Sequence, residues 1–308
     1  MNGSIINLND PLMKTLKIVN TISGRSLTEA DLKRHRKAME HAGRIAAPKG
    51  GVEAVGFSVG NVACEEIRPE FAHNPQYAIL YAHGGGYVSG GLPYARILAA
   101  KLAIATGFTT YSFDYRLAPE HPYPAAFEDG LAVWSYLTDR MYTPDHVIFA
   151  GESAGGNLVL CMVQSLMAGG HPIPSRLLLF SPWTDMTATA PSYDSNSEKD
   201  PILTGDYISE VAKAYIADAG DPKDARFSPL YGVLDDFPPV YIMAGRNEIL
   251  LDDSIRLADK INAAGGDAVT DIEENGWHVY QQMPIPIATR AMKRLSAYMT
   301  SQIYGERL

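Results

Sequence analysis

A serine between glycines offers the clearest chemistry in this sequence. Ser153 lies in the pentapeptide Gly151-Glu152-Ser153-Ala154-Gly155, which fits the pattern G-x-S-x-G. Residues 146–150 before it have strand character, and residues 156–167 after it have helical character. A serine on a sharp turn between a strand and a helix is typical of a nucleophile elbow, where a Cβ beside the serine would clash. The alternative is an ordinary Gly-Ser turn, because the pattern also arises by chance.

Three consecutive glycines supply a second element of acyl-transfer chemistry. They follow a predicted buried strand at residues 78–82, within the segment His83-Gly84-Gly85-Gly86-Tyr87. Bare backbone N–H groups after a strand can form an oxyanion hole, and the predicted donors are Gly84, Gly85, Gly86 and Ala154. A phosphate-binding loop is the alternative. The sequence disfavours it, because neither G-x-x-x-x-G-K-[ST] nor G-x-G-x-x-G fits these glycines.

A serine nucleophile needs a base, and His278 is the candidate. In α/β-hydrolases the catalytic residues follow the chain order serine, acid, histidine. Only His171 and His278 come after Ser153, and His171 lies in a turn directly after the helix that follows the serine. His278 follows the strand-like residues 268–273, where a catalytic histidine loop is expected. His121 precedes the serine and falls outside this order.

The acid that orients the histidine is expected after the strand at residues 240–244. Glu248, Asp252 and Asp253 are all candidates there. Glu248 is favoured because it lies nearest the end of the strand. Asp252 and Asp253 are expected to begin the next helix, where acidic residues interact favourably with the helix dipole.

Strands and helices alternate along most of the chain, which predicts a mostly parallel sheet covered by helices on both faces. An opening antiparallel pair is expected at residues 52–59 and 62–68. The other predicted strands are 78–82, 109–113, 147–150, 177–180, 240–244 and 268–273, and the helices are 94–106, 124–137, 154–167, 253–264 and 285–304.

Composition narrows the class of protein. The chain has 308 residues, of which 46% are hydrophobic, enough for one large α/β domain. Its net charge of −9 argues against binding to nucleic acid or to an anionic membrane surface. Cys64 and Cys161 show no metal-ligand spacing, which favours a reducing cytosol. No signal peptide is expected from residues 1–10, and no apolar run reaches about 18 residues.

Several of these segments resemble those of the hormone-sensitive-lipase-like esterases, the bacterial family IV carboxylesterases. The similarity is carried by Tyr81–Gly86, by Gly151–Gly155 and most specifically by residues 114–126, Asp-Tyr-Arg-Leu-Ala-Pro-Glu-His-Pro-Tyr-Pro-Ala-Ala. It covers roughly residues 75–302 and includes Ser181-Pro182-Trp183-Thr184-Asp185. The resemblance implies an α/β-hydrolase fold with Ser153 as nucleophile, His278 as base and Glu248 as acid.

Two positions depart from the family pattern. The family usually has Asp-Pro-Leu-x-Asp at the acid site, where this chain has Glu248-Ile249-Leu250-Leu251-Asp252. A glutamate is one methylene longer than an aspartate, yet it can orient a histidine in the same way. Glu152 stands in the elbow where the family often has Asp or Thr, and we expect it to support the site.

The resemblance also implies a helical cap over the active site. Helices are expected at residues 12–20 and 29–42, and a polar, turn-rich segment holds another at 206–218. The predicted organisation is residues 1–50 as the first part of the cap, 51–186 as catalytic domain, 187–224 as the second part of the cap and 225–308 as the rest of the catalytic domain.

The sequence therefore predicts a serine carboxylesterase that hydrolyses short- to medium-chain esters without a metal or organic cofactor. Tyr87 and Trp183 are expected to shape the substrate pocket. The expected partner is a small-molecule ester, and related enzymes suggest a homodimer. Two alternatives stay open. One is an amidase or formamidase with the same triad, and the other is a non-catalytic receptor like the plant gibberellin receptors, which have lost the histidine.

Overall fold

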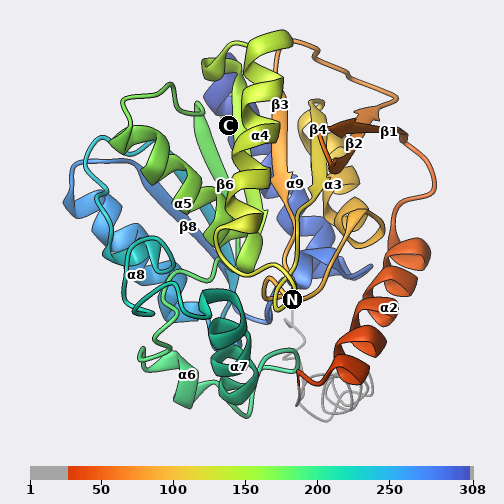
Figure 1. Cartoon of the computed structure of the whole chain (residues 1–308). Helices are drawn as coiled ribbons and strands as arrows, with labels where there is room; N and C mark the ends of the chain where they lie inside the picture. Colours follow the sequence, from red (N-terminus) through yellow and green to blue (C-terminus); the bar gives the residue numbers. More distant parts are fainter. Residues whose placement is uncertain (1–26, 306–308) are drawn as a thin grey trace, which may run out of the picture.

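An eight-stranded sheet forms the centre of the part of the chain that the structure describes, residues 27–305 (Figure 1). In this computed structural model the strands are ordered β1-β2-β4-β3-β5-β6-β7-β8. β2 pairs antiparallel with β1 and β4, and all the other pairs are parallel. The predicted mostly parallel sheet is confirmed. Its strands are Val52–Val59 (β1), Val62–Pro69 (β2), Ala78–Ala82 (β3), Thr109–Asp114 (β4), Val147–Glu152 (β5), Arg176–Phe180 (β6), Val240–Gly245 (β7) and Ala268–Glu273 (β8).

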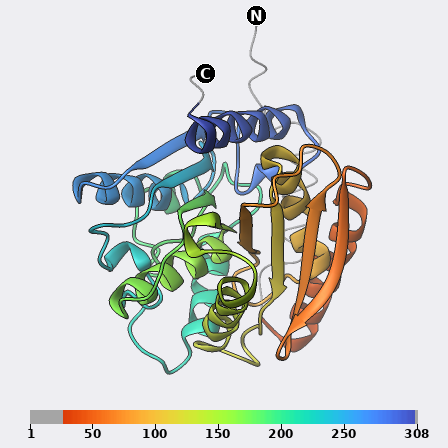
Figure 2. The same cartoon turned by 90° about the horizontal axis from the view of Figure 1, so that it is seen from above.

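Helices cover both faces of this sheet (Figure 2). One apolar cluster joins α3 (Leu92–Thr106) and α9 (Pro286–Tyr304) to one face. The other cluster joins α4 (Ala125–Arg140), α5 (Ala154–Ala168) and α8 (Leu251–Ala263) to the opposite face. The central strands β3, β5 and β7 are buried along their whole length, as expected for parallel strands between two helical layers.

Of three further helices, α6 (Ser192–Ser195) and α7 (Gly205–Ile216) lie below the sheet in Figure 1, and α2 (Glu29–Ala46) runs along the lower right, beside α3. Thr28 caps α2, accepting a hydrogen bond from the N–H of Asp31 at 3.3 Å. The helix predicted at 12–20 lies outside the described residues. The division of the chain into cap and catalytic segments stays a prediction. Short 3₁₀ helices at Pro144–His146, Pro229–Tyr231 (η2) and Tyr280–Gln282 (η3) complete the architecture.

Elements such as α2 and β5 extend beyond their predicted ends. α2 runs to Ala46 rather than ending at residue 42. Only glycine fits at position 43 of this helix, because a Cβ there would lie 2.1 Å from the carbonyl oxygen of Pro93 in α3. β5 runs two positions past the predicted end at 150, because Glu152 still pairs with Phe180. The short helix α6 was not predicted, since four residues show no periodicity.

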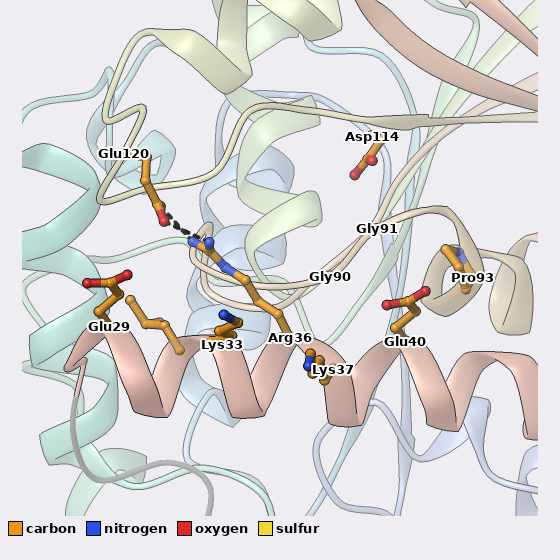
Figure 3. Close-up of a pocket in the computed structure, with 11 residues that line it drawn as sticks. Glu29, Lys33, Arg36, Lys37, Glu40, Gly90, Gly91, Pro93, Asp114 and Glu120 are labelled. Carbon is orange, nitrogen blue, oxygen red and sulfur yellow. Dashed lines mark hydrogen bonds and ion pairs between the residues drawn. The ribbon is translucent and has the colours of Figure 1, made fainter.

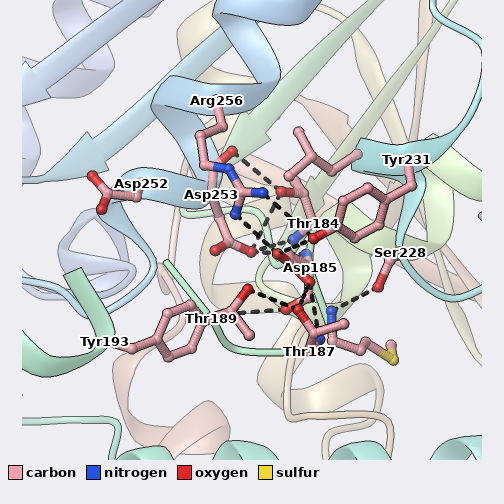
Figure 4. Close-up of polar contacts among 12 residues, drawn as sticks. Thr184, Asp185, Thr187, Thr189, Tyr193, Ser228, Tyr231, Asp252, Asp253 and Arg256 are labelled. Atoms are coloured by element: carbon pink, nitrogen blue, oxygen red, sulfur yellow. Dashed lines mark hydrogen bonds and ion pairs between the residues drawn. The ribbon is translucent and has the colours of Figure 1, made fainter. Parts of the chain in front are cut away.

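A buried carboxylate, Asp185, joins the segment after β6 to α8 and η2 (Figure 4). Its Oδ2 accepts hydrogen bonds from the hydroxyl of Tyr231 at 2.7 Å and from Nη1 of Arg256 at 2.9 Å. Its Oδ1 accepts from the N–H and the hydroxyl of Thr187. Burial raises the pKa of Asp185, but these hydrogen bonds outweigh it and the net pKa is lowered. This ion pair ties the segment after β6 to α8.

Removing the guanidinium of Arg256 should destabilise the protein, because it leaves the fully buried carboxylate of Asp185 without its cation. We expect Arg256→Met to lower the free energy of unfolding by about 1–3 kcal/mol, less than for a fully buried pair because Arg256 is partly exposed. Lys213→Met is the control, since the Lys213–Glu210 pair is exposed and should cost less than about 0.5 kcal/mol. Urea unfolding of both variants at pH 7 measures this, and equal losses would contradict the role given to Asp185.

Candidate active site

Ser153 stands on a tight turn between β5 and α5. Its backbone is in a strained region at φ 53° and ψ −121°. Glycines are required around it, because a Cβ on Gly151 would lie 2.4 Å from the carbonyl oxygen of Gly155, and one on Gly155 would lie 2.1 Å from that of Ala82. The carbonyl oxygen of Phe180 accepts from the N–H of Ser153 at 3.0 Å and so fixes the turn on β6. The turn has the geometry of a nucleophile elbow.

His278 meets Ser153 in space, although the two residues are 125 positions apart in the chain. Its Nε2 lies 3.0 Å from the hydroxyl oxygen of Ser153, within hydrogen-bonding distance. His278 follows β8 and directly precedes η3. Burial lowers the pKa of His278 to about 3, so the ring is neutral and can accept the hydroxyl proton. His171 and His121 are exposed and have no part in this contact.

Glu248 lies in the turn after β7, and Ser181 connects it to the segment that carries His278. Its Oε2 accepts hydrogen bonds from the hydroxyl of Ser181 at 2.7 Å and from the N–H of Gly245 at 3.1 Å. Its Oε1 and the Nδ1 of His278 are both buried without a hydrogen-bond partner. Two such groups, one an acceptor and the other able to carry a proton, are complementary. Burial raises the pKa of Glu248 to about 8.

The two competing carboxylates are used elsewhere. Oδ2 of Asp252 accepts from the N–H of Ser192 at 2.8 Å, and Oδ2 of Asp253 accepts from the N–H groups of Thr184 and Asp185. Both carboxylates lie in the first turn of α8, as the sequence predicted. Glu248 remains the candidate acid.

Ser181 was not singled out from the sequence as a site residue, yet it bridges the two halves of the candidate triad. Its hydroxyl donates to Glu248 and accepts from the N–H of Val279, next to His278, at 3.1 Å. Ser181 adopts a positive φ of 48° directly after β6. The only signal in the sequence was its place in the Ser181–Asp185 segment of the family resemblance.

Residues in the range 192–200 hydrogen-bond to the backbone of the turn that carries Glu248. Nδ2 of Asn196 donates to the carbonyl oxygens of Glu248 at 2.9 Å and Arg246 at 3.1 Å. Oδ2 of Asp200 accepts from the N–H of Ile249 at 2.9 Å. The position of Glu248 therefore depends on a segment that the sequence analysis assigned to the cap.

The structure corrects the predicted set of oxyanion donors. The N–H of Gly84 donates to Oε1 of Glu152 at 3.0 Å, so it is not available to a substrate. Gly85 and Gly86 line the cavity next to Ser153 and His278, and Ala154 is the first residue of α5. Their N–H groups remain the candidate donors.

A cavity of about 430 Å³ opens onto Ser153 and His278. Its wall is mostly apolar and includes side chains of α2 and α7, such as Met39 and Ile208. Trp183 lines this cavity, as predicted. Tyr87 does not, and that prediction is corrected. Its ring stacks on Tyr215 with centroids 3.6 Å apart, so it packs in the core.

A second pocket, of about 480 Å³, lies between α2 and the loop before α3 (Figure 3). Charged side chains line it, among them Glu29, Lys33 and Glu40, and Arg36 crosses it to form an ion pair with Glu120 at 2.7 Å. Neither Ser153 nor His278 reaches it. Of these two pockets, it is the apolar cavity that contains Ser153 and His278.

Residues 27–305 contain no group of three or more His, Cys, Asp or Glu side chains arranged to hold a metal ion. Within the same range, no helix has the length and apolar character needed to cross a membrane.

Comparison with known proteins places this geometry in a family. Residues 79–282 match a family model described as alpha/beta hydrolase fold. An acetyl-hydrolase of Streptomyces hygroscopicus is 32% identical over 268 residues, covering 85% of this chain and 86% of the relative. The solved structure of an esterase from the bacterial hormone-sensitive lipase family superposes with a TM-score of 0.88 at 29% identity, covering 98% of this chain and all of the other.

A further solved structure, EstE5 from a crystal soaked with p-nitrophenyl butyrate, has a TM-score of 0.85 at 36% identity and covers 95% of this chain and 98% of its own. Fold, elbow and relatives agree: the chain belongs to the α/β-hydrolase fold family, among the hormone-sensitive-lipase-like carboxylesterases.

Proposed function

We propose that this carboxylic ester hydrolase cleaves short- to medium-chain esters through an acyl-enzyme formed on Ser153. The observation that carries the proposal is the 3.0 Å contact between the Ser153 hydroxyl and Nε2 of a buried, neutral His278. A hydroxyl held on a base in this way is the activated nucleophile of acyl transfer.

In acylation, the Ser153 oxygen attacks the ester carbonyl while Nε2 of His278 takes the hydroxyl proton. The carbonyl oxygen becomes an oxyanion and binds the N–H groups of Gly85, Gly86 and Ala154. The tetrahedral intermediate collapses as His278 gives its proton to the departing alcohol. Water, deprotonated by His278, then attacks the acyl-enzyme and releases the carboxylic acid and the free serine.

Glu248 stabilises the imidazolium that forms twice in this cycle. Its free Oε1 accepts the Nδ1–H of His278, which selects the tautomer with a bare Nε2. Such hydrogen bonds are often loose without substrate and shorten in the reacting complex. Ser181 keeps the carboxylate turned toward the histidine by occupying Oε2.

The apolar cavity supports a neutral ester of limited length as substrate. Each buried methylene is worth about 0.8 kcal/mol, so activity should rise with acyl length until the cavity is filled. The same triad could cleave amides, because the fold does not distinguish the two leaving groups. An amidase is therefore the alternative that the substrate test must address.

The proposal includes a cytoplasmic location and no metal or organic cofactor. Cys64 and Cys161 are both free and buried, which suits a reducing compartment. A homodimer stays a prediction from the resemblance.

A p-nitrophenyl ester series from acetate to palmitate tests substrate and nucleophile together. We expect kcat/KM to peak at short acyl chains, because longer chains exceed a cavity of about 430 Å³. Ser153→Ala should lower kcat by more than about 10³-fold. Long-chain esters cleaved faster than butyrate would contradict the chain-length proposal. Faster cleavage of a matched anilide would favour the amidase.

The pH dependence of kcat/KM tests Glu248. With a pKa of about 8 it is protonated below that pH and cannot accept the Nδ1–H, so activity should rise as pH increases through about 8. His278 stays neutral over the whole range from pH 5 to 10. Glu248→Gln should lower kcat by about 10²–10⁴-fold and remove this rise. The rates of wild type and Glu248→Gln are measured at each pH against a Ser153→Ala blank. An unchanged rise of kcat/KM with pH in Glu248→Gln would refute the assignment of Glu248 as the acid.

A further inference from the structure

Glu152, the residue before the nucleophile, is fully buried and receives hydrogen bonds from several directions. Its Oε1 accepts from the N–H of Gly84 at 3.0 Å and from Nε2 of Gln282 at 2.8 Å. Its Oε2 accepts from the hydroxyl of Tyr81. The hydroxyl of Tyr94 is a further partner. Each of these four groups donates a hydrogen bond to the carboxylate of Glu152.

The set of partners favours the ionised form of this carboxylate. A protonated acid would have to donate its own proton, whereas all the groups around Glu152 donate to it. No Lys or Arg is among them, so hydrogen bonds alone oppose the cost of burial. Burial raises the pKa of Glu152 and outweighs the bonds from Tyr81, Gly84, Tyr94 and Gln282, which lower it, so the net pKa is raised.

The donors come from the elements that build the active site. Tyr81 and Gly84 belong to the end of β3 and its glycine loop, Tyr94 belongs to α3, and Gln282 ends η3, four positions after His278. One oxygen, Oε1, thus bonds both the glycine loop and the histidine loop. Lys101 holds η3 from the other side, with Nζ donating to the carbonyl oxygens of Gln281, Gln282 and Met283.

Contact distances show how closely the glycine loop lies on the elbow. A Cβ on Gly84 would stand 2.9 Å from Cγ of Glu152 and 3.1 Å from Cβ of Ser153. Since the N–H of Gly84 points into the carboxylate, its bond to Oε1 sets the orientation of that peptide. Gly85 and Gly86 follow directly, and their positive φ values of 106° and 64° turn the loop along the cavity.

We propose that Glu152 is a positioning residue that fixes the oxyanion loop against the nucleophile, so that the N–H groups of Gly85 and Gly86 face the developing oxyanion. This inference rests on the proposed acyl-enzyme function. Glu152 does not touch the substrate. It acts through Gly84, and through Gln282 it ties the same loop to the segment that carries His278.

The test compares Glu152→Gln with the matched control Glu65→Gln. Glu65 is also a buried glutamate, but it lies on β2 and pairs with Arg96, and neither residue lines the cavity. The amide of Glu152→Gln keeps the shape but turns an NH₂ toward donors. For each variant we would measure kcat and KM on p-nitrophenyl butyrate, the Ki of a trifluoromethyl ketone that forms a hemiketal with Ser153, and the melting temperature.

We expect Glu152→Gln to lower kcat by about 10- to 100-fold with KM within threefold, because misaligned donors weaken only the tetrahedral state. The Ki of the ketone should rise by a similar factor. Glu65→Gln should keep both values within threefold, whatever its melting temperature. A Glu152→Gln enzyme with unchanged kcat and Ki, or one that loses only thermal stability, would overturn the proposal.

Tyr81→Phe gives a second test if Glu152→Gln does not fold, because it removes one donor and leaves the carboxylate. Tyr81 is buried and does not line the cavity. We expect about a 3- to 10-fold loss in kcat and in affinity for the ketone, and no change in either would count against Glu152. Failure of the acyl-enzyme function itself would appear separately, as full activity in Ser153→Ala.

Discussion

The hydrogen bond between Ser153 and His278 is the contact on which the rest of the site depends. It joins residues 125 positions apart, and neither side chain could hold this geometry alone. The sheet brings them together: β5 ends at the elbow, and the loop after β8 carries the histidine. Close packing leaves the serine little choice of orientation, because the glycines around it admit no side chain.

Buried carboxylates surround this contact without direct cationic partners. Glu152 accepts from the N–H of Gly84 in the glycine loop, Glu248 accepts from Ser181, and Asp253 holds the backbone at Thr184 and Asp185. Burial raises the pKa of each of them. Backbone N–H and hydroxyl donors lower each pKa only in part, so all three stay raised overall.

Residues 192–204 serve two purposes at once. Ser197, Ile202 and Leu203 line the cavity, while Asn196 and Asp200 hold the turn that bears Glu248. The same short segment therefore contributes to the cavity wall and hydrogen-bonds to the turn that bears Glu248.

The sequence by itself determined the alternation of strands and helices, the elbow and the loop that carries the histidine. These features depend on local patterns: apolar runs mark buried strands, and glycines at Gly151 and Gly155 mark a turn that no other residue can make. Local patterns also limited the candidates for the catalytic acid to Glu248, Asp252 and Asp253. The end of α2 at Ala46 was not predicted, because a glycine at position 43 signals a helix end locally, whereas here it lets α2 lie close to Pro93.

Only the tertiary structure decided which groups face one another. The sequence predicted Gly84 as an oxyanion donor, but its N–H donates to Glu152. It predicted Tyr87 as a pocket residue, but the ring of Tyr87 stacks on Tyr215. For Ser181 the sequence offered only its place in a segment of the family resemblance, since its partners Glu248 and Val279 are distant in sequence. Hydrogen-bond partners are set by the packing of remote segments, and a residue's type states only what it could bind, not what it meets.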